Sequence, residues 1–200
     1  MADLQDMLPN DCWQRLFGND HPVAIEIGPG RGEFLRAVAA ARPGWNFYAV
    51  ERSSTRTAQI EAQLTTAGLA NARVLWGDAG CVLPALPAGS AAAVFIQFPD
   101  PWWKRRHFKR RVWTPGLAAA IRHVLAAGAE VEFLTDVKET FTLGLGFLDA
   151  EPELQRVAVG QLEHHATDFA RKALSRGGVI YRSRHRHVPP TECGASAPLS

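Results

Sequence analysis

Val23-Ala-Ile-Glu-Ile-Gly-Pro-Gly-Arg-Gly-Glu33 is the stretch that decides the fold, because an apolar run here ends in a turn with three glycines. Residues 23–28 have the composition of a short buried strand, and residues 33–42 have helical patterning. Glycine lets the chain turn sharply between them and approach a ligand closely. A strand, a glycine turn and a helix predict the first unit of an α/β sheet.

The same alternation continues along the chain. Apolar runs bounded by turn residues predict strands at 46–51, 72–78, 91–98 and 130–136. Helical patterning predicts helices at 53–68, at about 80–86, and at 115–127, the last one closed by Gly128. Strands that alternate with helices favour right-handed crossovers and a parallel sheet covered on both faces.

The last third of the chain adds a helix at about 138–148, a strand at about 154–162, a short helix at 167–175 and a strand at about 179–186. The final two strands are expected to close the sheet like a hairpin. Because residues 181–187 alternate between two polar sets, the last strand is expected at an edge, antiparallel to its neighbour. We therefore predict an α/β, Rossmann-like fold with a mostly parallel seven-stranded sheet, helices on both faces and an antiparallel edge strand.

The bulk properties suit one domain. The chain has 200 residues, of which 46% are hydrophobic and 21% charged. We predict a short N-terminal arm at 1–20, one domain at 21–188 and a flexible tail at 189–200. The first residues do not resemble a secretory signal, and no apolar run approaches the roughly 20 residues of a membrane span. Three cysteines without a Cys-x-x-Cys pair indicate neither disulfides nor a metal site, and a cytoplasmic location fits best.

Charge is distributed unevenly. Residues 1–100 carry 7 Lys and Arg against 10 Asp and Glu, whereas residues 101–200 carry 15 against 10. The second half is therefore the more basic one, which favours an anionic partner there.

Five carboxylates lie at or just past the ends of the five predicted parallel strands: Glu26, Glu51, Asp78, Asp100 and Asp136. In open α/β sheets that edge is where ligands bind. Any one of these residues could simply cap a helix or fill a turn. Five in corresponding places favour a shared site.

The glycine loop fits a cationic ligand better than a phosphate. Gly28, Gly30 and Gly32 are spaced G-x-G-x-G rather than G-x-G-x-x-G, and no Lys-Ser/Thr pair follows them. Glu26 and Glu33 would repel a pyrophosphate but attract the amino group and sulfonium of S-adenosylmethionine. Glu51, about 20 residues on, is placed to accept hydrogen bonds from ribose hydroxyls. Asp78 could accept from the adenine amino group, or serve only as a turn residue.

A second motif follows the fourth strand, Gln97-Phe-Pro-Asp-Pro-Trp-Trp-Lys104. Two prolines around Asp100 hold its carboxylate on a stiff backbone. Trp102 and Trp103 could stack on RNA bases. The run 104–111 carries six formal positive charges in eight residues with no carboxylate among them, which favours phosphate binding over a solvated helix face. Its cationic residues are Lys104, Arg105, Arg106, Lys109, Arg110 and Arg111.

Taken together, these motifs resemble the bacterial tRNA (guanine-N7-)-methyltransferase family, which are class I S-adenosylmethionine-dependent methyltransferases. The resemblance spans about residues 23–187 and includes Thr135-Asp136 and the Thr-x-Phe-x-x-Lys pattern at 167–172. The Pro-Asp-Pro-Trp-x-Lys segment is its most specific part. It implies methylation of guanine N7 in tRNA, in the variable loop.

The resemblance also implies roles for individual residues. It implies cofactor-binding positions at Glu26, Glu51, Asp78 and Asp100, with Asp100 also catalytic. It implies substrate positions at Lys104, Asp136 and the segment that begins at Thr167. A tRNA partner, a monomer or homodimer, and no metal are expected.

Two positions depart from the family pattern. Trp103 replaces the usual proline, and Ala170 replaces a glutamate that would help to bind the substrate. Asp168 or Arg171 could compensate for that missing carboxylate. Three alternatives therefore stay open: a methyltransferase of the same fold with another RNA or small-molecule acceptor, a non-catalytic RNA-binding paralogue, and a nicotinamide-dependent oxidoreductase. The glycine spacing disfavours the last.

Overall fold

The computed structural model describes residues 11–101, 112–159, 175 and 177–190. The predicted RNA-contacting residues at 102–111, the predicted helix at 167–175 apart from Ser175, and most of the predicted tail lie outside the described residues. So do Thr167 and Ala170.

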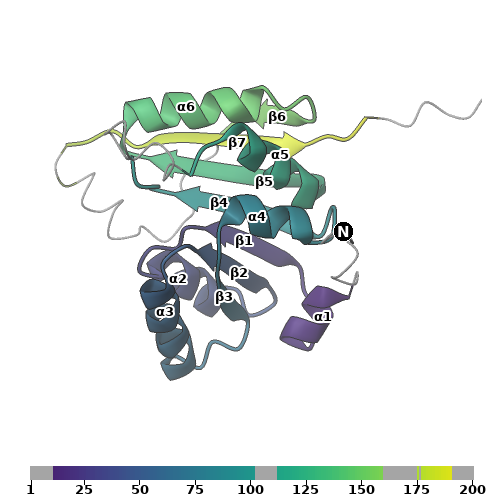
Figure 1. Cartoon of the computed structure of the whole chain (residues 1–200), viewed down its shortest axis with the longest axis vertical. Helices are drawn as coiled ribbons and strands as arrows, with labels where there is room; N and C mark the ends of the chain where they lie inside the picture. The colour runs from purple at the N-terminus through teal and green to yellow at the C-terminus, as the bar shows by residue number, and fades with distance from the viewer. Residues whose placement is uncertain (1–10, 102–111, 160–174, 176, 191–200) are drawn as a thin grey trace, which may run out of the picture.

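The fold is one seven-stranded sheet in the order β3-β2-β1-β4-β5-β7-β6, as Figure 1 shows. The first five strands pair in parallel, and β7 runs antiparallel to both β5 and β6. The strands are β1 (Val23–Ile27), β2 (Asn46–Glu51), β3 (Ala72–Trp76), β4 (Ala91–Gln97), β5 (Leu125–Thr135), β6 (Leu154–Val157) and β7 (Tyr181–His187). The helices are α1 (Cys12–Phe17), α2 (Glu33–Ala41), α3 (Ser54–Thr66), α4 (Ala79–Val82), the 3-10 turn η2 (Leu83–Ala85), α5 (Pro115–Val124) and α6 (Lys138–Asp149).

Helices cover both faces of the sheet, as predicted. One core contains buried residues of α2 and α3 packed on β1, β2 and β3, with Phe34 and Phe95 in edge-to-face contact at 5.1 Å between ring centroids. The other core joins α4, η2, α5 and α6 to the opposite face. Strands β1 and β2 are buried along their whole length, which is why they consist largely of apolar residues.

The boundary between α5 and β5 was predicted wrongly. Thr114 caps α5 by accepting a hydrogen bond from the Leu117 N–H at 3.2 Å, and the helix ends at Val124, not at 127. Leu125 then begins β5 by pairing with Ala91. Gly128, with φ of 78°, lies inside the strand. The Leu-Ala-Ala sequence favours a helix, but pairing with β4 and full burial of Leu125 outweigh that weak preference.

The antiparallel closure of the sheet is confirmed, although β6 rather than β7 is the outermost strand. Within the described residues β6 spans only Leu154–Val157, shorter than predicted. The arginines of β7 do not require an edge position, because glutamates of β5 pair with them: Arg182 binds Glu132, and Arg184 and Arg186 bind Glu130. Polar residues are tolerated in this inner strand because their charges are paired.

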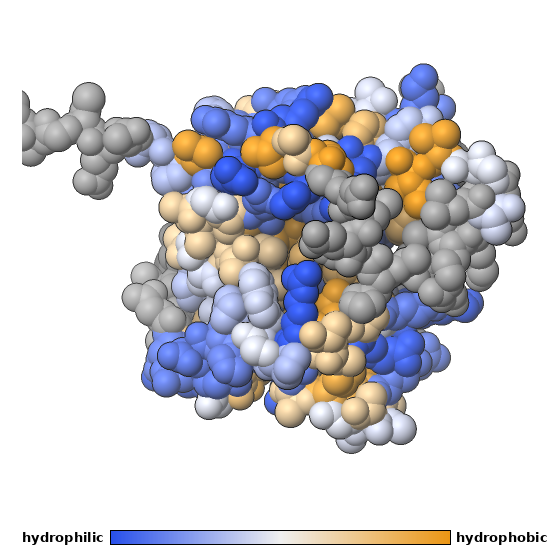
Figure 2. Space-filling view, turned by 180° about the vertical axis from the view of Figure 1, so that it is seen from behind, coloured by the Kyte–Doolittle hydropathy of each residue, from blue (hydrophilic) through white to orange (hydrophobic). Residues whose placement is uncertain are grey.

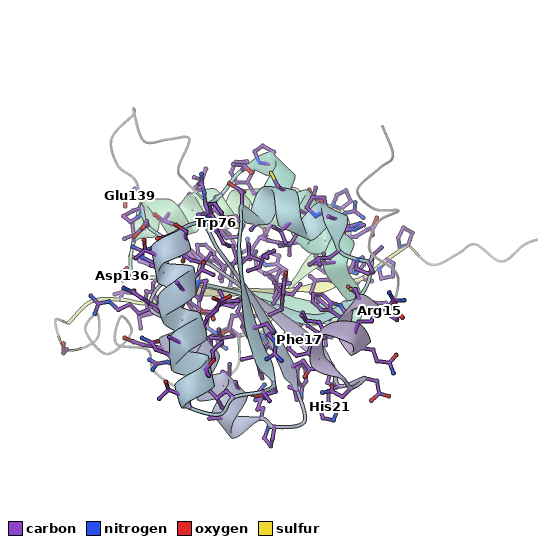
Figure 3. The ribbon with its side chains drawn as sticks, turned by 60° about the horizontal axis from the view of Figure 1, so that its bottom comes forward. Arg15, Phe17, His21, Trp76, Asp136 and Glu139 are labelled. Carbon is purple, nitrogen blue, oxygen red and sulfur yellow. The ribbon has the colours of Figure 1, made fainter. Side chains whose placement is uncertain are left out.

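Helix α1 closes the edge of the molecule at which the parallel strands begin. Trp13 packs edge-to-face on Tyr48 at 5.0 Å, and Arg73 lies over the Phe17 ring at 5.6 Å. In Figure 3, Arg15, Phe17 and His21 lie on one side of the molecule, and Trp76, Asp136 and Glu139, from the carboxyl-end edge of the sheet, lie on the other. The two ends of the parallel strands therefore differ: helix α1 packs over their amino ends, and their carboxyl ends carry the candidate site.

Candidate active site

A pocket of about 720 Å³ lies at the carboxyl ends of β1 to β4. The chain leaves β1 toward β2 on one side, and β4 lies on the other, so the pocket occupies the point where the strand order reverses. Four of the five predicted strand-end carboxylates line it: Glu26, Glu51, Asp78 and Asp100. The fifth, Asp136, is exposed and is not among the lining residues.

The glycine loop forms one wall of this pocket. Gly28, Gly30 and Gly32 all have positive φ, at 73°, 59° and 72°, a region that residues with a side chain rarely adopt. The Gly28 N–H donates to the Val50 carbonyl at 2.9 Å and so fixes the start of the loop against β2. A Cβ at Gly32 would lie 3.0 Å from Ile60 Cγ1, which is tighter than ordinary packing. The backbone conformation therefore favours glycine at all three positions, and the close approach of Ile60 favours it further at Gly32.

Glu26 is the most unusual group in the pocket. It lies inside β1, not at its end, and is 5% exposed. Its Oε2 is buried and has no hydrogen-bond partner among the described residues. Burial, with the nearby Glu51 adding to it, raises the pKa of Glu26 to about 8. A buried carboxyl group without a partner, facing a pocket, is suited to a ligand that brings a positive charge.

Glu51 and Asp78 are held in defined orientations at the ends of β2 and β3. Glu51 Oε1 accepts a hydrogen bond from the Ser53 N–H at 2.8 Å. Asp78 Oδ1 accepts from the Gly80 N–H at 2.9 Å, and Oδ2 lies 3.2 Å from Arg52 Nε. Asp78 is thus the N-cap of α4, the structural role that the sequence left open, and it lines the pocket as well. Because a carboxylate has about four lone-pair sites, Glu51 and Asp78 can each accept further hydrogen bonds from a ligand.

The loop after β4 contains the one described residue other than glycine with a positive φ, Phe98 at 46°. Its N–H donates to the Leu134 carbonyl at 2.9 Å, and Pro99 follows it, so the surroundings hold this strained conformation. Asp100, two residues beyond Phe98, is exposed and lines the pocket. The prolines predicted a stiff loop, but nothing in the sequence indicated the positive φ.

A second cavity, of about 540 Å³, lies on the other side of Asp100. Asp100 and Val112 line both cavities, so the two meet there. The second cavity is walled by Trp113 and Leu143 and by residues of the first turns of α6. Sequence reasoning missed it, together with Val112, Thr114 and Leu117 in the first pocket, because these residues become neighbours of the site only through the packing of α5 and α6.

The described residues hold no group of three or more His, Cys, Asp or Glu that could bind a metal ion. Within the same part of the chain, no helix is long and apolar enough to cross a membrane. The residues that line the pocket are oriented carboxylates beside a glycine loop, which suit binding of a cationic group at Glu26 and acceptance of hydrogen bonds at Glu51 and Asp78.

The comparisons with known proteins agree with this geometry. Residues 20–183 match a family model described as "Putative methyltransferase". A protein named tRNA (guanine-N(7)-)-methyltransferase from Rhodopirellula baltica is 35% identical over 188 residues, covering 86% of this chain and 69% of the relative. A protein with the same name from Acidithiobacillus ferrooxidans is 34% identical, and the alignment covers 88% of this chain and 81% of the relative. Another from Synechococcus elongatus is 37% identical, and the alignment covers 75% of this chain and 73% of the relative.

Solved structures show the same fold at low sequence identity. A variant of the 16S rRNA (adenine(1408)-N(1))-methyltransferase from Catenulisporales acidiphilia, determined with its cosubstrate SAM, has a TM-score of 0.64 and 19% identity, covering 96% of this chain and 95% of that one. The 16S rRNA methyltransferase KamB has a TM-score of 0.64 and 15% identity, covering 91% and 95%. The predicted Rossmann-like methyltransferase fold is confirmed.

Proposed function

The chain belongs to the tRNA (guanine-N7-)-methyltransferase family, and from that premise we propose that it transfers a methyl group from S-adenosylmethionine to N7 of a guanine in tRNA. The observation that carries the proposal is the pocket at the carboxyl ends of β1 to β4, which is lined by a glycine loop and five carboxylates, the fifth being Glu33. A cytoplasmic location fits a tRNA substrate and the free thiols of Cys12 and Cys81.

The residues of the first pocket fit the cofactor group by group. The unpartnered Oε2 of Glu26 would bind the cationic amino group beside the glycine loop. Glu51, at the end of β2, would accept hydrogen bonds from the ribose hydroxyls. Asp78 would lie near the adenine amino group while it keeps its bond to the Gly80 N–H. The cofactor, when bound, supplies a methyl group on a positively charged sulfur.

The acceptor chemistry requires little from the protein beyond position and charge. Guanine N7 has an in-plane lone pair and no proton, so no general base is needed. The lone pair forms the new N–C bond while the electrons of the old C–S bond return to sulfur. The base becomes cationic as it accepts the methyl group, and the carboxylate of Asp100, which lines both cavities, would stabilise that charge.

Asp100 can be tested by removing its charge and keeping its shape. Asp100→Asn is expected to lower kcat for methyl transfer by about 100-fold or more, in the range found when one electrostatic stabiliser is removed. Cofactor affinity, measured by calorimetry on the same protein, tells lost binding from lost catalysis. Near-normal transfer by the variant would show that Asp100 is not the stabilising group.

The basic run at 104–111 is proposed to hold the RNA backbone, and Trp102 to stack on a base. Changing Lys109 and Arg110 together to Gln should weaken tRNA binding and make its dependence on log salt less steep by about 2. Filter binding over a range of salt concentrations measures the slope. An unchanged slope would place the RNA surface elsewhere.

The decisive experiment is nucleoside analysis of bulk tRNA treated with the protein and labelled S-adenosylmethionine. Label in 7-methylguanosine is expected. Label in another nucleoside would favour a same-fold enzyme with a different acceptor. A protein that neither labels tRNA nor binds the cofactor would be the non-catalytic RNA-binding paralogue.

A further inference from the structure

The second cavity has the properties of a subsite for a planar base. Its volume of about 540 Å³ lies within the usual range for ligand pockets. Apolar side chains of Pro101, Val112, Trp113 and Leu143 form its walls, and polar groups come from the first turns of α6. Trp113 is 3% exposed and packs edge-to-face on Phe133 at 4.7 Å, so this wall is rigid.

The second cavity lies where the chemistry of methyl transfer requires the acceptor base. The attacking atom must approach the methyl group from the side opposite the sulfur, so cofactor and acceptor lie on either side of the transfer point. Asp100 and Val112 line the first pocket and the second one, and no other residue is shared among those that the structure describes as lining them. If the cofactor occupies the first pocket, the second is where the acceptor base can present its reacting edge to Asp100.

A base held this way turns its other edge toward α6. When guanine N7 faces the transfer point, its N1–H and N2–H groups point away and require acceptors. Of the described residues that line the second cavity, Glu139 is the one carboxylate besides Asp100. Lys138 can only donate through its side chain, and the hydroxyls of Thr140 and Thr142 each offer a single oxygen, whereas a carboxylate offers two adjacent oxygens for the paired N1–H and N2–H groups. Glu139 is exposed and has no ion pair within the described residues.

We propose that Glu139 is a specificity-determining residue that accepts hydrogen bonds from the N1–H and N2–H groups of the acceptor guanine. This inference rests on the proposed function. Glu139 lies in the first turn of α6, three residues after Asp136, and Figure 3 shows both on the same side of the molecule. Asp136 lines neither cavity, whereas Glu139 lines the second. The carboxylate of α6 is thus the better placed of the two to meet the base inside the cavity.

The test pairs a change in the protein with a change in the base. After nucleoside mapping has identified the methylated guanosine, two tRNAs are prepared, one with guanosine there and one with inosine, which lacks only the N2 amino group. Wild-type protein should prefer guanosine over inosine in kcat/KM by about 10- to 100-fold, the usual effect of losing a hydrogen bond to a charged group. Glu139→Ala should reduce that preference to about threefold or less, mainly by slowing methylation of the guanosine tRNA.

Two further variants sharpen the result. Glu139→Gln keeps one acceptor oxygen and should restore part of the preference. Glu61→Gln changes an exposed glutamate of α3 that lines neither cavity, and it should behave like wild type. Cofactor affinity should be the same in all four proteins, which establishes that they are folded and that the first pocket is intact.

The two ways of failing are distinguishable. If wild-type protein labels no guanine N7 in tRNA, the proposed function fails and the role of Glu139 fails with it. If wild-type protein methylates guanine and Glu139→Ala discriminates against inosine as strongly as wild type does, the proposed function stands and only the assignment to Glu139 is overturned.

Discussion

Glu26 and Glu132 lie in the same row of the sheet, on either side of Phe95, yet their carboxylates have opposite surroundings. They are 5% and 4% exposed. Glu132 is paired with Arg182, whose guanidinium donates to Glu132 Oε2, once at 3.0 Å from Nε, whereas Glu26 has no ion pair with any residue that the structure describes. Equal burial therefore does not indicate an equal role: one carboxylate is neutralised inside the protein and the other faces a pocket.

The same contrast separates the two halves of the sheet. Around β5, β7 and β6, charged groups are paired, and Glu130 binds both Arg184 and Arg186. Figure 2 shows hydrophilic and hydrophobic residues side by side at the surface of the upper part of the molecule, where Figure 1 places these strands. Around β1, β2 and β3, the carboxylates line a cavity. Changes in the first group should reduce stability, and changes in the second should reduce binding.

The largest stability effect is expected at Glu132. Glu132→Ala leaves the Arg182 guanidinium, whose side chain is 8% exposed, without its buried partner. Removing one member of a buried pair typically costs about 3–5 kcal/mol, which should appear as a lower denaturation midpoint in urea. Glu130→Ala, on the same strand but at a more exposed pair, should cost about 1 kcal/mol or less. Equal losses for the two variants would remove the distinction between paired burial and surface pairing.

A smaller loss of stability is expected at Gly144, where α6 packs on the other face of β5. A Cβ at Gly144 of α6 would lie 2.4 Å from Trp113 Cε2 and 2.6 Å from Phe133 Cε1. Gly144→Ala should therefore destabilise the protein by about 1–3 kcal/mol through overpacking. Gly146→Ala, two residues further along α6, would place a Cβ that meets nothing within 4 Å and should stabilise the helix by about 0.5–1 kcal/mol. Opposite shifts in the thermal midpoint would confirm the difference, and a neutral Gly144→Ala would contradict it.

Much of the first half could be predicted from sequence because its signals are local. Strands β1 to β4 follow from apolar runs, and the glycine loop follows from its spacing. Glu51 and Asp78 were expected at strand ends: Glu51 is the last residue of β2, and Asp78 lies two residues after β3. The position of each such residue depends on its own neighbours in the chain, and strand order then brings the ends together.

The second half was less predictable because its partners are distant in sequence. Arg182 and Glu132 are fifty residues apart, so the alternating charges of β7 suggested an exposed edge when the strand is in fact covered on both sides by β5 and β6. The early start of β5 at Leu125 likewise depends on Ala91. The left-handed Phe98 has no local signal, because its conformation is imposed by contacts around it.

Glu26 provides the most specific test of the comparison, through pH. Its pKa is raised to about 8 in the folded protein from an ordinary value of 4.5. The folded state therefore holds one more proton than the unfolded state between these values, and stability falls as pH rises through that window. Glu26→Gln should abolish this part of the pH dependence. The difference in thermal midpoint between wild type and variant, measured from pH 5.5 to 8.5 without cofactor, isolates Glu26 from other titrating groups, and Glu61→Gln is the control.

The same group links cofactor binding to proton release. At pH 7 most of the Glu26 side chains in the cofactor-free protein are protonated, since the pKa of this group is about 8. If Glu26 pairs with the cationic amino group of S-adenosylmethionine, it must ionise on binding, and wild-type protein should release a proton as the complex forms. Calorimetry in buffers of different ionisation enthalpy measures that proton, and Glu26→Gln should release fewer protons and bind more weakly. Equal proton release by the two proteins would mean that a residue other than Glu26 holds the amino group.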